Sequence, residues 1–410
     1  MNKYLFMVDE LPPTRSANGI CAEKVMECLL NDGEVSCISW DDNEEQTGIK
    51  RYKISRKPWE EFSRKIIKKN NILSRVILII ARCLYFIKRM CLMYMWPVDS
   101  IRCARNFYHK ADELIRNERI THVIAVSFPG ETVLAMKWLK KRYKDKIKTI
   151  LYPLDVTIEG KATKGIIEKV LSRLGGKRFL RNCGKYADAI MVLENAQDLF
   201  YKSFSEQEHG KFIICGIPLL QQTDWSKYQV HPKENDVHII FGGNLIAGMR
   251  EPTILLDTLD SLDLPQNRNI VFDLFGQMDK TLKDLWNDRF CNLCIVEHGW
   301  VKEETLNEAL INADILLSVG NSEKYLIPSK LFKYMTTGKP ILHFLSTEKD
   351  PCIPYLNCYK NSFMVNKDNL DNTKKELTDF VLSNYVSDVS VVELFPTCTP
   401  QYTANKIIEI

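Results

Sequence analysis

Short apolar runs alternate with helical patterns along most of the 410-residue chain. The runs are apolar on both faces, which is typical of parallel strands covered by helices on each side. A first series covers residues 4–8, 35–39, 122–126, 149–152, 189–193 and 211–214, and a second covers 238–241, 270–275, 294–296, 315–318 and 340–344. This rhythm predicts α/β architecture with two doubly wound, Rossmann-like domains.

A polar, turn-rich stretch near Pro218 and Pro232 separates the two series. We therefore expect a first domain over 1–217, a linker over 218–236 and a second domain over 237–398. The last residues, 399–410, read as a helix that could pack back on the first domain. Ligands of open α/β sheets bind outside the carboxyl ends of the strands, so the site is expected in a cleft between the two domains.

Composition narrows the class of protein. A hydrophobic fraction of 45% and a charged fraction of 26% are ordinary for a globular protein and exclude a disordered or fibrous chain.

The 13 cysteines are odd in number and scattered, which favours a reducing compartment and hence the cytoplasm. Cys291 and Cys294 have CxxC spacing, but no second pair or histidine cluster accompanies them, so buried small side chains are expected rather than a zinc or redox site. The apolar run at the amino terminus reads as a first strand, and it is too short for the hydrophobic region of a signal peptide.

Residues 51–105 are strongly basic, with 14 Lys and Arg against 3 Asp and Glu. Within the segment 62–102, the basic side chains considered are Lys68, Arg75, Arg82, Lys88 and Arg89. Four of them are spaced by seven residues, which places them in one stripe of a helix whose other faces are apolar. This pattern favours a helix lying in the headgroup region of an anionic membrane. A buried helix pair with solvated charges and a membrane span are the alternatives, and the span is disfavoured because charges interrupt it.

Glycines follow several predicted strands, where a backbone can approach a ligand closely. In the first domain, Asn18 and Gly19 stand at the mouth of the first helix, without GxGxxG spacing. In the second domain, Gly243 and Asn244 follow a strand, and Arg250 precedes the next helix. That arrangement suits a diphosphate held by backbone amides and a guanidinium, although a plain strand–turn–helix with a surface arginine would look the same.

Later loops of the second domain add candidates for binding the same ligand. They are Gly276, Gly299, Trp300, Asn321, Tyr325, Pro328, Ser329, Lys330 and Lys333. Ser329 is expected to cap a helix over 329–337. Lysines near the start of a helix oppose its dipole, so Lys330 and Lys333 are better explained by a bound anion than by helix stability, with ordinary surface lysines as the alternative.

These segments together resemble the retaining glycosyltransferases of family 4, whose type-B (GT-B) fold has two Rossmann-like domains facing each other across a cleft. The match is sharpest at 313–341, in ADILLS followed by PSKLFKYMTTGKPI, and FGGNLIAGMREP is similar to the donor-diphosphate loop. The resemblance implies that Gly243, Asn244 and Arg250 hold the donor diphosphate. It also implies a reaction that needs no metal ion, and we expect no cofactor.

The chain departs from the family at its two signature glutamates, whose positions are occupied by Tyr325 and Lys333. Glu323, two residues from the first position, could serve instead. In the first domain, the family often has a His-Asp pair after a strand, and this chain keeps only the aspartate, Asp155. Together with Arg250, these two carboxylates are the catalytic candidates, and the loop containing Ser127, Gly130 and Glu131 is expected to contact the acceptor.

The resemblance therefore implies a hexosyltransferase that takes a sugar from a nucleotide-sugar, UDP-linked rather than GDP-linked, in surface polysaccharide synthesis. The acceptor would be a glycan or a polyprenyl-linked sugar at the cytoplasmic face of the membrane, and no nucleic acid is expected as a partner. Two alternatives remain open. One is a non-catalytic partner subunit, suggested by the missing glutamates, and the other is a nucleotide-sugar epimerase on the same fold. A nicotinamide enzyme is disfavoured, because GxGxxG is absent after the first strand.

Overall fold

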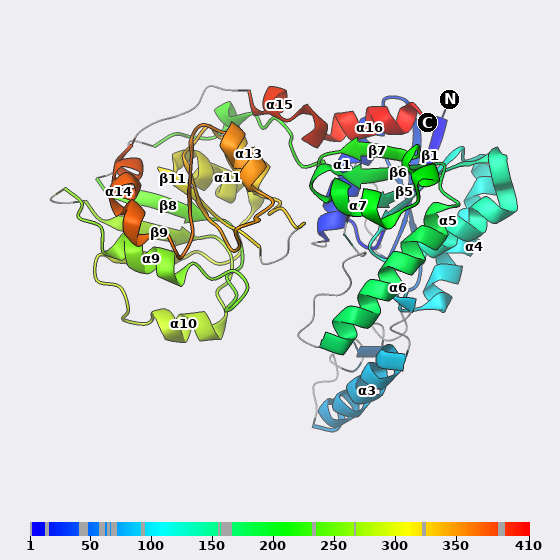
Figure 1. Ribbon diagram of the computed structural model, residues 1–410, viewed down its shortest axis with the longest axis horizontal. Coiled ribbons are helices and arrows are strands. Elements are labelled where there is room, and N and C mark those ends of the chain that lie inside the picture. The colour runs from blue at the N-terminus through cyan, green and yellow to red at the C-terminus, as the bar shows by residue number, and fades with distance from the viewer. Residues whose placement is uncertain are drawn as a thin grey trace. The chain divides into compact units, whose positions relative to one another are not determined.

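A computed structural model of the chain describes most of its residues. The described residues are 2–12, 16–40, 48–56, 62–63, 66, 72–91, 95–154, 156, 166–231, 235–265, 268–321, 325–383 and 390–410. They form two compact units (Figure 1). The first unit comprises Met1–Pro218 together with Thr397–Ile410, and the second comprises Leu219–Pro396.

The first unit is built on a seven-stranded parallel sheet in the order β3-β2-β1-β4-β5-β6-β7. Its strands are β1 (Asn2–Met7), β2 (Gly33–Ser39), β3 (Lys50–Lys53), β4 (His122–Ser127), β5 (Lys148–Pro153), β6 (Ala189–Leu193) and β7 (Phe212–Cys215). Every residue of β4 and β6 is buried, as expected for central parallel strands with helices on both faces.

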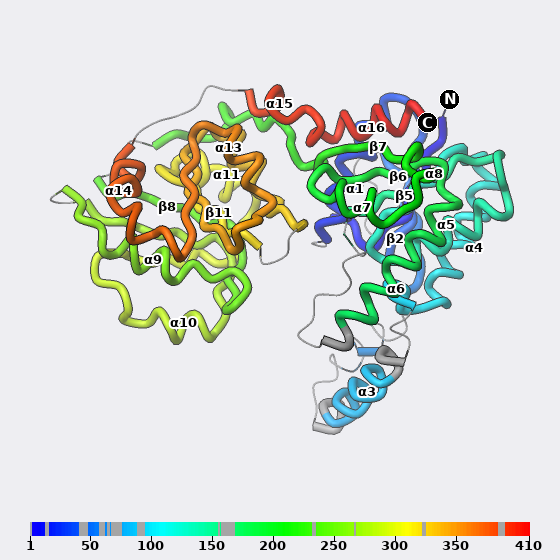
Figure 2. The backbone as a smooth tube through the Cα atoms, in the orientation of Figure 1, coloured from blue at the N-terminus to red at the C-terminus, as the bar shows by residue number. Residues whose placement is uncertain are grey.

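The main helices of this unit are α1 (Ala17–Leu29), α3 (Ile72–Cys91), α4 (Ile101–Glu118), α5 (Gly130–Tyr143) and α6 (Ile166–Gly184). Shorter elements are η2 (Lys144–Lys146), η4 (Glu194–Ala196), α7 (Gln197–Ser203) and α8 (Glu206–His209). The carboxy-terminal helix α16 (Pro400–Ile408) packs against α1 and β7, as the tube in Figure 2 shows in red. Where the chain leaves and re-enters this unit, the amide of Gly216 donates a hydrogen bond to the carbonyl oxygen of Thr397 at 2.9 Å.

The second unit has a six-stranded parallel sheet in the order β10-β9-β8-β11-β12-β13. Its strands are β8 (Val237–Phe241), β9 (Ile270–Leu274), β10 (Leu293–Glu297), β11 (Ile315–Val319), β12 (Ile341–Phe344) and β13 (Ser362–Val365). The helical elements are η5 (Trp225–Lys227), α9 (Thr253–Asp260), α10 (Lys280–Trp286), α11 (Glu303–Asn312), α12 (Leu331–Thr336), α13 (Ile353–Cys358), η6 (Asp371–Thr373), α14 (Lys374–Leu382), α15 (Val391–Leu394) and η7 (Pro396–Cys398), of which η7 reaches into the first unit.

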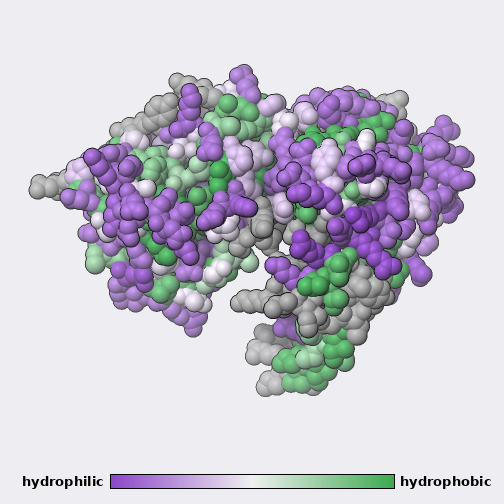
Figure 3. All heavy atoms as spheres, in the orientation of Figure 1, coloured by the Kyte–Doolittle hydropathy of each residue, from purple (hydrophilic) through white to green (hydrophobic). Residues whose placement is uncertain are grey.

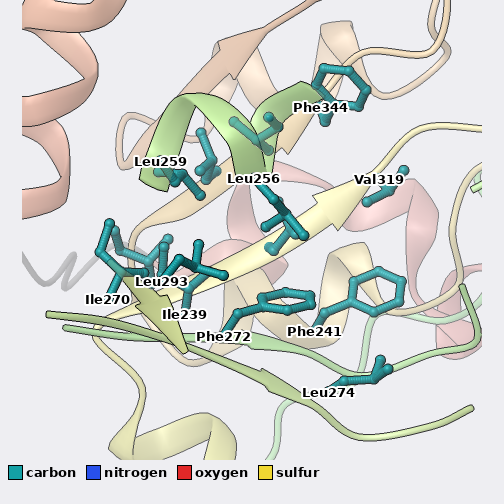
Figure 4. Close-up of a cluster of buried hydrophobic side chains, with 14 of the residues drawn as sticks. Ile239, Phe241, Leu256, Leu259, Ile270, Phe272, Leu274, Leu293, Val319 and Phe344 are labelled. Atoms are coloured by element: carbon teal, nitrogen blue, oxygen red, sulfur yellow. The ribbon is translucent and has the colours of Figure 1, made fainter. Parts of the chain in front are cut away.

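One hydrophobic core of the second unit lies between its sheet and the helices α9, α10 and α14. Figure 4 shows Ile239 and Phe241 of β8 beside Phe272 and Leu274 of β9, with Leu256 and Leu259 of α9 above them. Alternate residues of each strand enter this core, so the intervening residues face the opposite layer of helices. The strands are thereby fixed, and the loops at their carboxyl ends are left to form a site.

The structure differs from the sequence-based prediction in some elements. The edge strands β3 and β13 were not predicted, because β3 is polar and β13 is only partly buried. The predicted cap Ser329 is wrong: α12 begins at Leu331, with Lys330 at the N-cap position and no side-chain hydrogen bond. The expectation of burial is also wrong for Cys291 and Cys294, whose side chains are exposed.

A single helix, α3, occupies the middle of the predicted membrane segment. Its exposed large apolar side chains are Val76, Ile77, Ile79, Ile80, Leu84, Phe86 and Ile87, and Figure 3 shows hydrophobic residues gathered there. At 100° per residue these positions span about half of the helix circumference. Arg82 is also exposed and lies outside that arc. Among the helices that the structure describes, none is long and apolar enough to cross a bilayer.

Candidate functional site

The loops after β8 and β11 meet at the point where the order of the second sheet reverses. From β8 the chain proceeds to β9 on one side, whereas β11 pairs with β8 on the other side. Such a switch point leaves a crevice at the carboxyl ends of the two strands, which is where open α/β sheets bind ligands. Most of the predicted donor-binding residues belong to the loops at this edge.

Arg250 lies beside the loop after β11, and its side chain is partly buried. A tight turn sets its position, because the backbones of Ile246 and Arg250 bond each other in both directions, at 3.2 and 2.9 Å. Its Nε donates to Oδ1 of Asn321 at 3.0 Å, and Nδ2 of Asn321 donates to the carbonyl oxygen of Leu326 at 2.9 Å. Among the described residues, the two Nη groups of Arg250 have no hydrogen-bond partner.

Burial lowers the pKa of the Arg250 guanidinium from its usual value. An arginine pKa starts so high that the group stays charged at neutral pH. The crevice therefore holds a partly buried positive charge whose outer donors are available, an arrangement that favours a bidentate anion.

The loops after β8 and β9 approach each other too closely for a side chain at Gly276. Gly276 has a φ of +156°, and a Cβ there would lie 2.0 Å from the carbonyl oxygen of Gly243. The amide of Gly242 donates to the buried hydroxyl of Tyr334 at 2.8 Å. Nζ of Lys330 lies 3.4 Å from the position that a Cβ of Gly243 would take, so a second cation stands beside this loop.

The structure assigns different partners to two predicted ligand contacts. Oδ1 of Asn244 accepts a hydrogen bond from the amide of Gln277 at 3.1 Å, so this oxygen links the two glycine loops. Nζ of Lys333 donates to the carboxylate of Glu303 at 2.7 Å, and its charge is already paired. Both residues hold the site together more directly than they offer free groups to a ligand.

The remaining donor-side candidates occupy nearby loops. Gly299 follows β10 with a φ of +69°, and the next side chain, Trp300, is 50% exposed. Tyr325, Pro328 and Ser329 lie in the loop before α12 and are partly or fully exposed. Glu323 lies outside the described residues.

Sequence reasoning missed the role of Tyr334, whose pKa burial raises to about 12. It also missed Asp273, which accepts hydrogen bonds from His238 at 2.8 Å and His298 at 2.6 Å. The ring of His298 stacks on Phe275, 4.2 Å between centroids. The spacing between these residues is irregular, so no sequence pattern pointed to them.

The first unit has a similar crevice between β1 and β4, where its strand order reverses. Ser16 caps α1 by accepting from the amide of Gly19, and its hydroxyl contacts both carboxylate oxygens of Asp9 at 2.9 and 3.0 Å. Nδ2 of Asn18 donates to the carbonyl oxygen of Phe128 at 3.2 Å and so joins the loops after β1 and β4.

The β4–α5 loop has a largely structural role in the described contacts. Glu131 is buried, and its Oε1 accepts from the amides of Asp99 and Ser100 at 3.0 and 2.8 Å, at the start of α4. Ser127 is also buried, and Gly130 begins α5 against Pro97. Asp155 lies outside the described residues.

Asp9 should make the stability of the protein depend on pH. Burial raises the pKa of its carboxyl from 3.8 to about 6, so the folded state binds a proton more tightly than the unfolded state. The contribution of the protonated Asp9 carboxyl to the free energy of unfolding is fully present below pH 3.8. It is lost as the pH rises through 6, which lowers the free energy of unfolding by about 3 kcal/mol. Asp9→Asn should therefore flatten the pH dependence of the free energy of unfolding in this window, measured by urea denaturation. A parallel pH dependence in both proteins would contradict this assignment.

Comparisons with known proteins identify the fold. No protein-family model matches the chain, and no curated protein sequence matches it. Among solved structures, a glycosyltransferase from Rickettsia africae has a TM-score of 0.56 at 12% identity, over 100% of this chain and 93% of its own. The lipopolysaccharide outer core galactosyltransferase WaaB has a TM-score of 0.57 at 12% identity, over 99% of both chains. The chain has the GT-B fold.

A UDP-GlcNAc 2-epimerase from Methanocaldococcus jannaschii also matches, with a TM-score of 0.53 at 10% identity over 100% of both chains. The GT-B fold thus includes solved structures of both transferases and epimerases similar to this chain. At these identities the likeness establishes architecture alone, which confirms the fold predicted from the sequence. Membership of family 4 stays a prediction.

Proposed function

We propose that this GT-B chain is a glycosyltransferase that takes a sugar from a UDP-linked donor bound in the second unit. The observation that carries the proposal is the Arg250–Asn321 pair at the β8/β11 switch point, in which the two Nη groups of Arg250 have no hydrogen-bond partner among the described residues. A uridine donor is favoured because UDP-sugar chemistry appears among the structural matches.

The protein would promote the transfer reaction at this site by electrostatic stabilisation. When the bond between the sugar and the diphosphate breaks, negative charge develops on the departing oxygens. Arg250, aided by Lys330 beside Gly243, would stabilise that charge without forming a bond to the sugar. The close approach of Gly276 to Gly243 leaves the loop amides near the same charge.

A thermal-shift panel of UDP, GDP, UDP-sugars and GDP-sugars tests donor binding. A ligand at 100 times its Kd should add about 2.7 kcal/mol to the free energy of unfolding, and we expect this only with uridine ligands. Stabilisation by the guanosine ligands alone would contradict the donor assignment. The absence of stabilisation by every nucleotide would instead favour a non-catalytic partner subunit.

The epimerase is a second candidate, supported by the matching epimerase structure. It is distinguished by incubating the protein with the UDP-sugar that binds, in the absence of any acceptor. An epimerase converts the donor into its epimer, whereas the proposed transferase leaves it intact until a glycan or polyprenyl-linked acceptor is added. Chromatography and mass spectrometry of the nucleotide-sugar separate these outcomes.

The exposed apolar arc of α3 supports an acceptor at a membrane surface. Seven large apolar side chains on one helix would be costly to leave in water, and contiguous apolar surface of this kind marks interaction sites. With the basic residues Arg75, Lys88 and Arg89 in the same helix, α3 suits an anionic headgroup layer, where a lipid-linked acceptor would be reached. Lys68 lies outside the described residues.

Leu84→Glu should weaken binding to vesicles containing anionic lipid by about tenfold or more, because burial of one leucine is worth about 1.5–3 kcal/mol. Leu84 is 63% exposed, and Leu285 of α10 is a matched control at 42% exposure. Leu285→Glu should leave sedimentation with the vesicles unchanged. Equal binding by the wild type and both variants would remove α3 from the membrane contact.

A further inference from the structure

Three side chains of different chemistry converge inside the second unit, next to the carboxyl ends of β11 and β12. They are His343 of β12, Asp350 in the following loop, and Cys352 immediately before α13. One nitrogen, oxygen or sulfur atom from each lies within 4.8 Å of the others. The side chains of His343 and Asp350 have no solvent exposure, and Cys352 is fully buried.

Two atoms of this cluster have no hydrogen-bond partner among the described residues. They are Nε2 of His343 and Oδ2 of Asp350, which lie 3.4 Å from each other. The opposite edges of both side chains are satisfied: Nδ1 of His343 pairs with Oγ of Ser318 at 2.9 Å, and Oδ1 of Asp350 accepts from the amide of Cys352 at 2.9 Å. Leaving a buried polar atom without a hydrogen-bond partner destabilises the folded state, and more so if the atom is charged. The arrangement therefore calls for a shared partner between the two atoms.

We propose that His343, Asp350 and Cys352 supply three ligands to a single buried zinc ion, whose fourth position is left to a water molecule. Imidazole, carboxylate and thiolate are the ligand types that zinc takes in proteins. A doubly charged cation with one thiolate, one carboxylate and a neutral imidazole carries no net charge, so the occupied site avoids burying an unpaired ion. The hydroxyl of Ser318 holds the ring of His343 from behind, as outer partners of zinc-bound histidines do.

Zinc binding at this site should release a proton. Cysteine binds zinc as the thiolate, so the thiol proton of Cys352 must leave. On binding, the S–H bond breaks, a Zn–S bond forms and the proton leaves to solvent.

The cluster also lies directly behind the proposed donor site. A Cβ at Gly320 would lie 1.9 Å from Oδ2 of Asp350, so only glycine lets the carboxylate reach its place. The next residue is Asn321, which holds Arg250. A metal here would clamp the end of β12 to the start of α13, beside the loop after β11. Its presence can be tested without any assay of transfer.

The test uses the full chain, purified without a metal-binding tag, with its zinc content measured by plasma mass spectrometry. We expect about one zinc per chain in the wild type and about none in Cys352→Ser. Replacement of the zinc by cobalt should give a thiolate-to-cobalt charge-transfer band that Cys352→Ser lacks. Cys358→Ser, a change at an exposed cysteine at the end of α13, should keep both the zinc and the band.

The exposed pair Cys291 and Cys294 is the competing thiol site, and the double variant Cys291→Ser/Cys294→Ser should retain full zinc. Loss of zinc in that variant with retention in Cys352→Ser would overturn the proposal. So would a folded wild-type protein that holds no zinc and gives no cobalt band, because the cluster would then be a histidine–aspartate ion pair. If Cys352→Ser fails to fold, the zinc content and the cobalt band of the wild type and of Cys291→Ser/Cys294→Ser decide the question.

Discussion

Arg250→Ala is expected to lower kcat/KM for sugar transfer by about 10²–10³-fold, the effect of removing one preorganised donor to developing negative charge. The guanidinium is partly buried and held through Nε, and neither Nη group has a hydrogen-bond partner among the described residues. Arg250→Lys keeps the charge without the planar fork and should recover only part of the activity. The measurement is steady-state transfer from the donor identified by thermal shift, together with donor Kd.

Arg289→Ala is the matched control, since Arg289 is an exposed arginine of the same unit, paired with Asp257 at 2.7 Å. It should change kcat/KM by less than about twofold, as exposed ion pairs contribute little. Asn321→Ala should fall between the two, because it frees Nε of Arg250 while leaving the cation in place. Unchanged donor affinity and turnover in Arg250→Ala would remove this residue from the diphosphate site and with it the proposed function.

Gly276→Ala is expected to destabilise the second unit by about 3 kcal/mol or more. A methyl group there would overlap the carbonyl of Gly243, 2.0 Å away, in a backbone conformation that side chains rarely adopt. Gly248 provides a control, since it has a φ of +70° and a Cβ added there would meet nothing within 4 Å. Gly248→Ala should lower the free energy of unfolding by only about 1 kcal/mol, the cost of a non-glycine residue in the left-handed conformation.

Urea denaturation of both variants, followed by circular dichroism, gives the comparison. Gly276→Ala should also lose donor binding under conditions where it remains folded, because the overlap moves the loop that carries Gly243. Equal destabilisation by the two substitutions would mean that the loops after β8 and β9 are further apart than described.

The central strands could be predicted from the sequence because burial on both faces leaves uninterrupted apolar runs. β4 and β11 are fully buried, and both were predicted within a residue or two of their ends. The edge strands carry no such signal, since β3 reads KRYK and pairs on one side only. The carboxy-terminal end of α3 was equally hidden, because apolar residues continue in the sequence from Leu92 to Trp96.

The site could be predicted only where its residues are local in the sequence. Gly243 and Arg250 follow one strand within a short loop, so their pattern was visible. The partners that hold them come from far along the chain, as with Asn321 beside Arg250 and Tyr334 beside Gly242. The same holds for Ser318 beside His343, a contact that requires β11 and β12 to be paired.

The packing of α16 has a consequence for how the protein is made. The first unit includes Thr397–Ile410, which follow the second unit in the sequence, so a ribosome completes it only after the whole second unit has been synthesised. Until then, the surface of α1 that α16 covers stays open on the nascent chain. A premature stop that spares every strand would still leave the amino-terminal unit unfinished, so a carboxy-terminal truncation should appear as an amino-terminal folding defect.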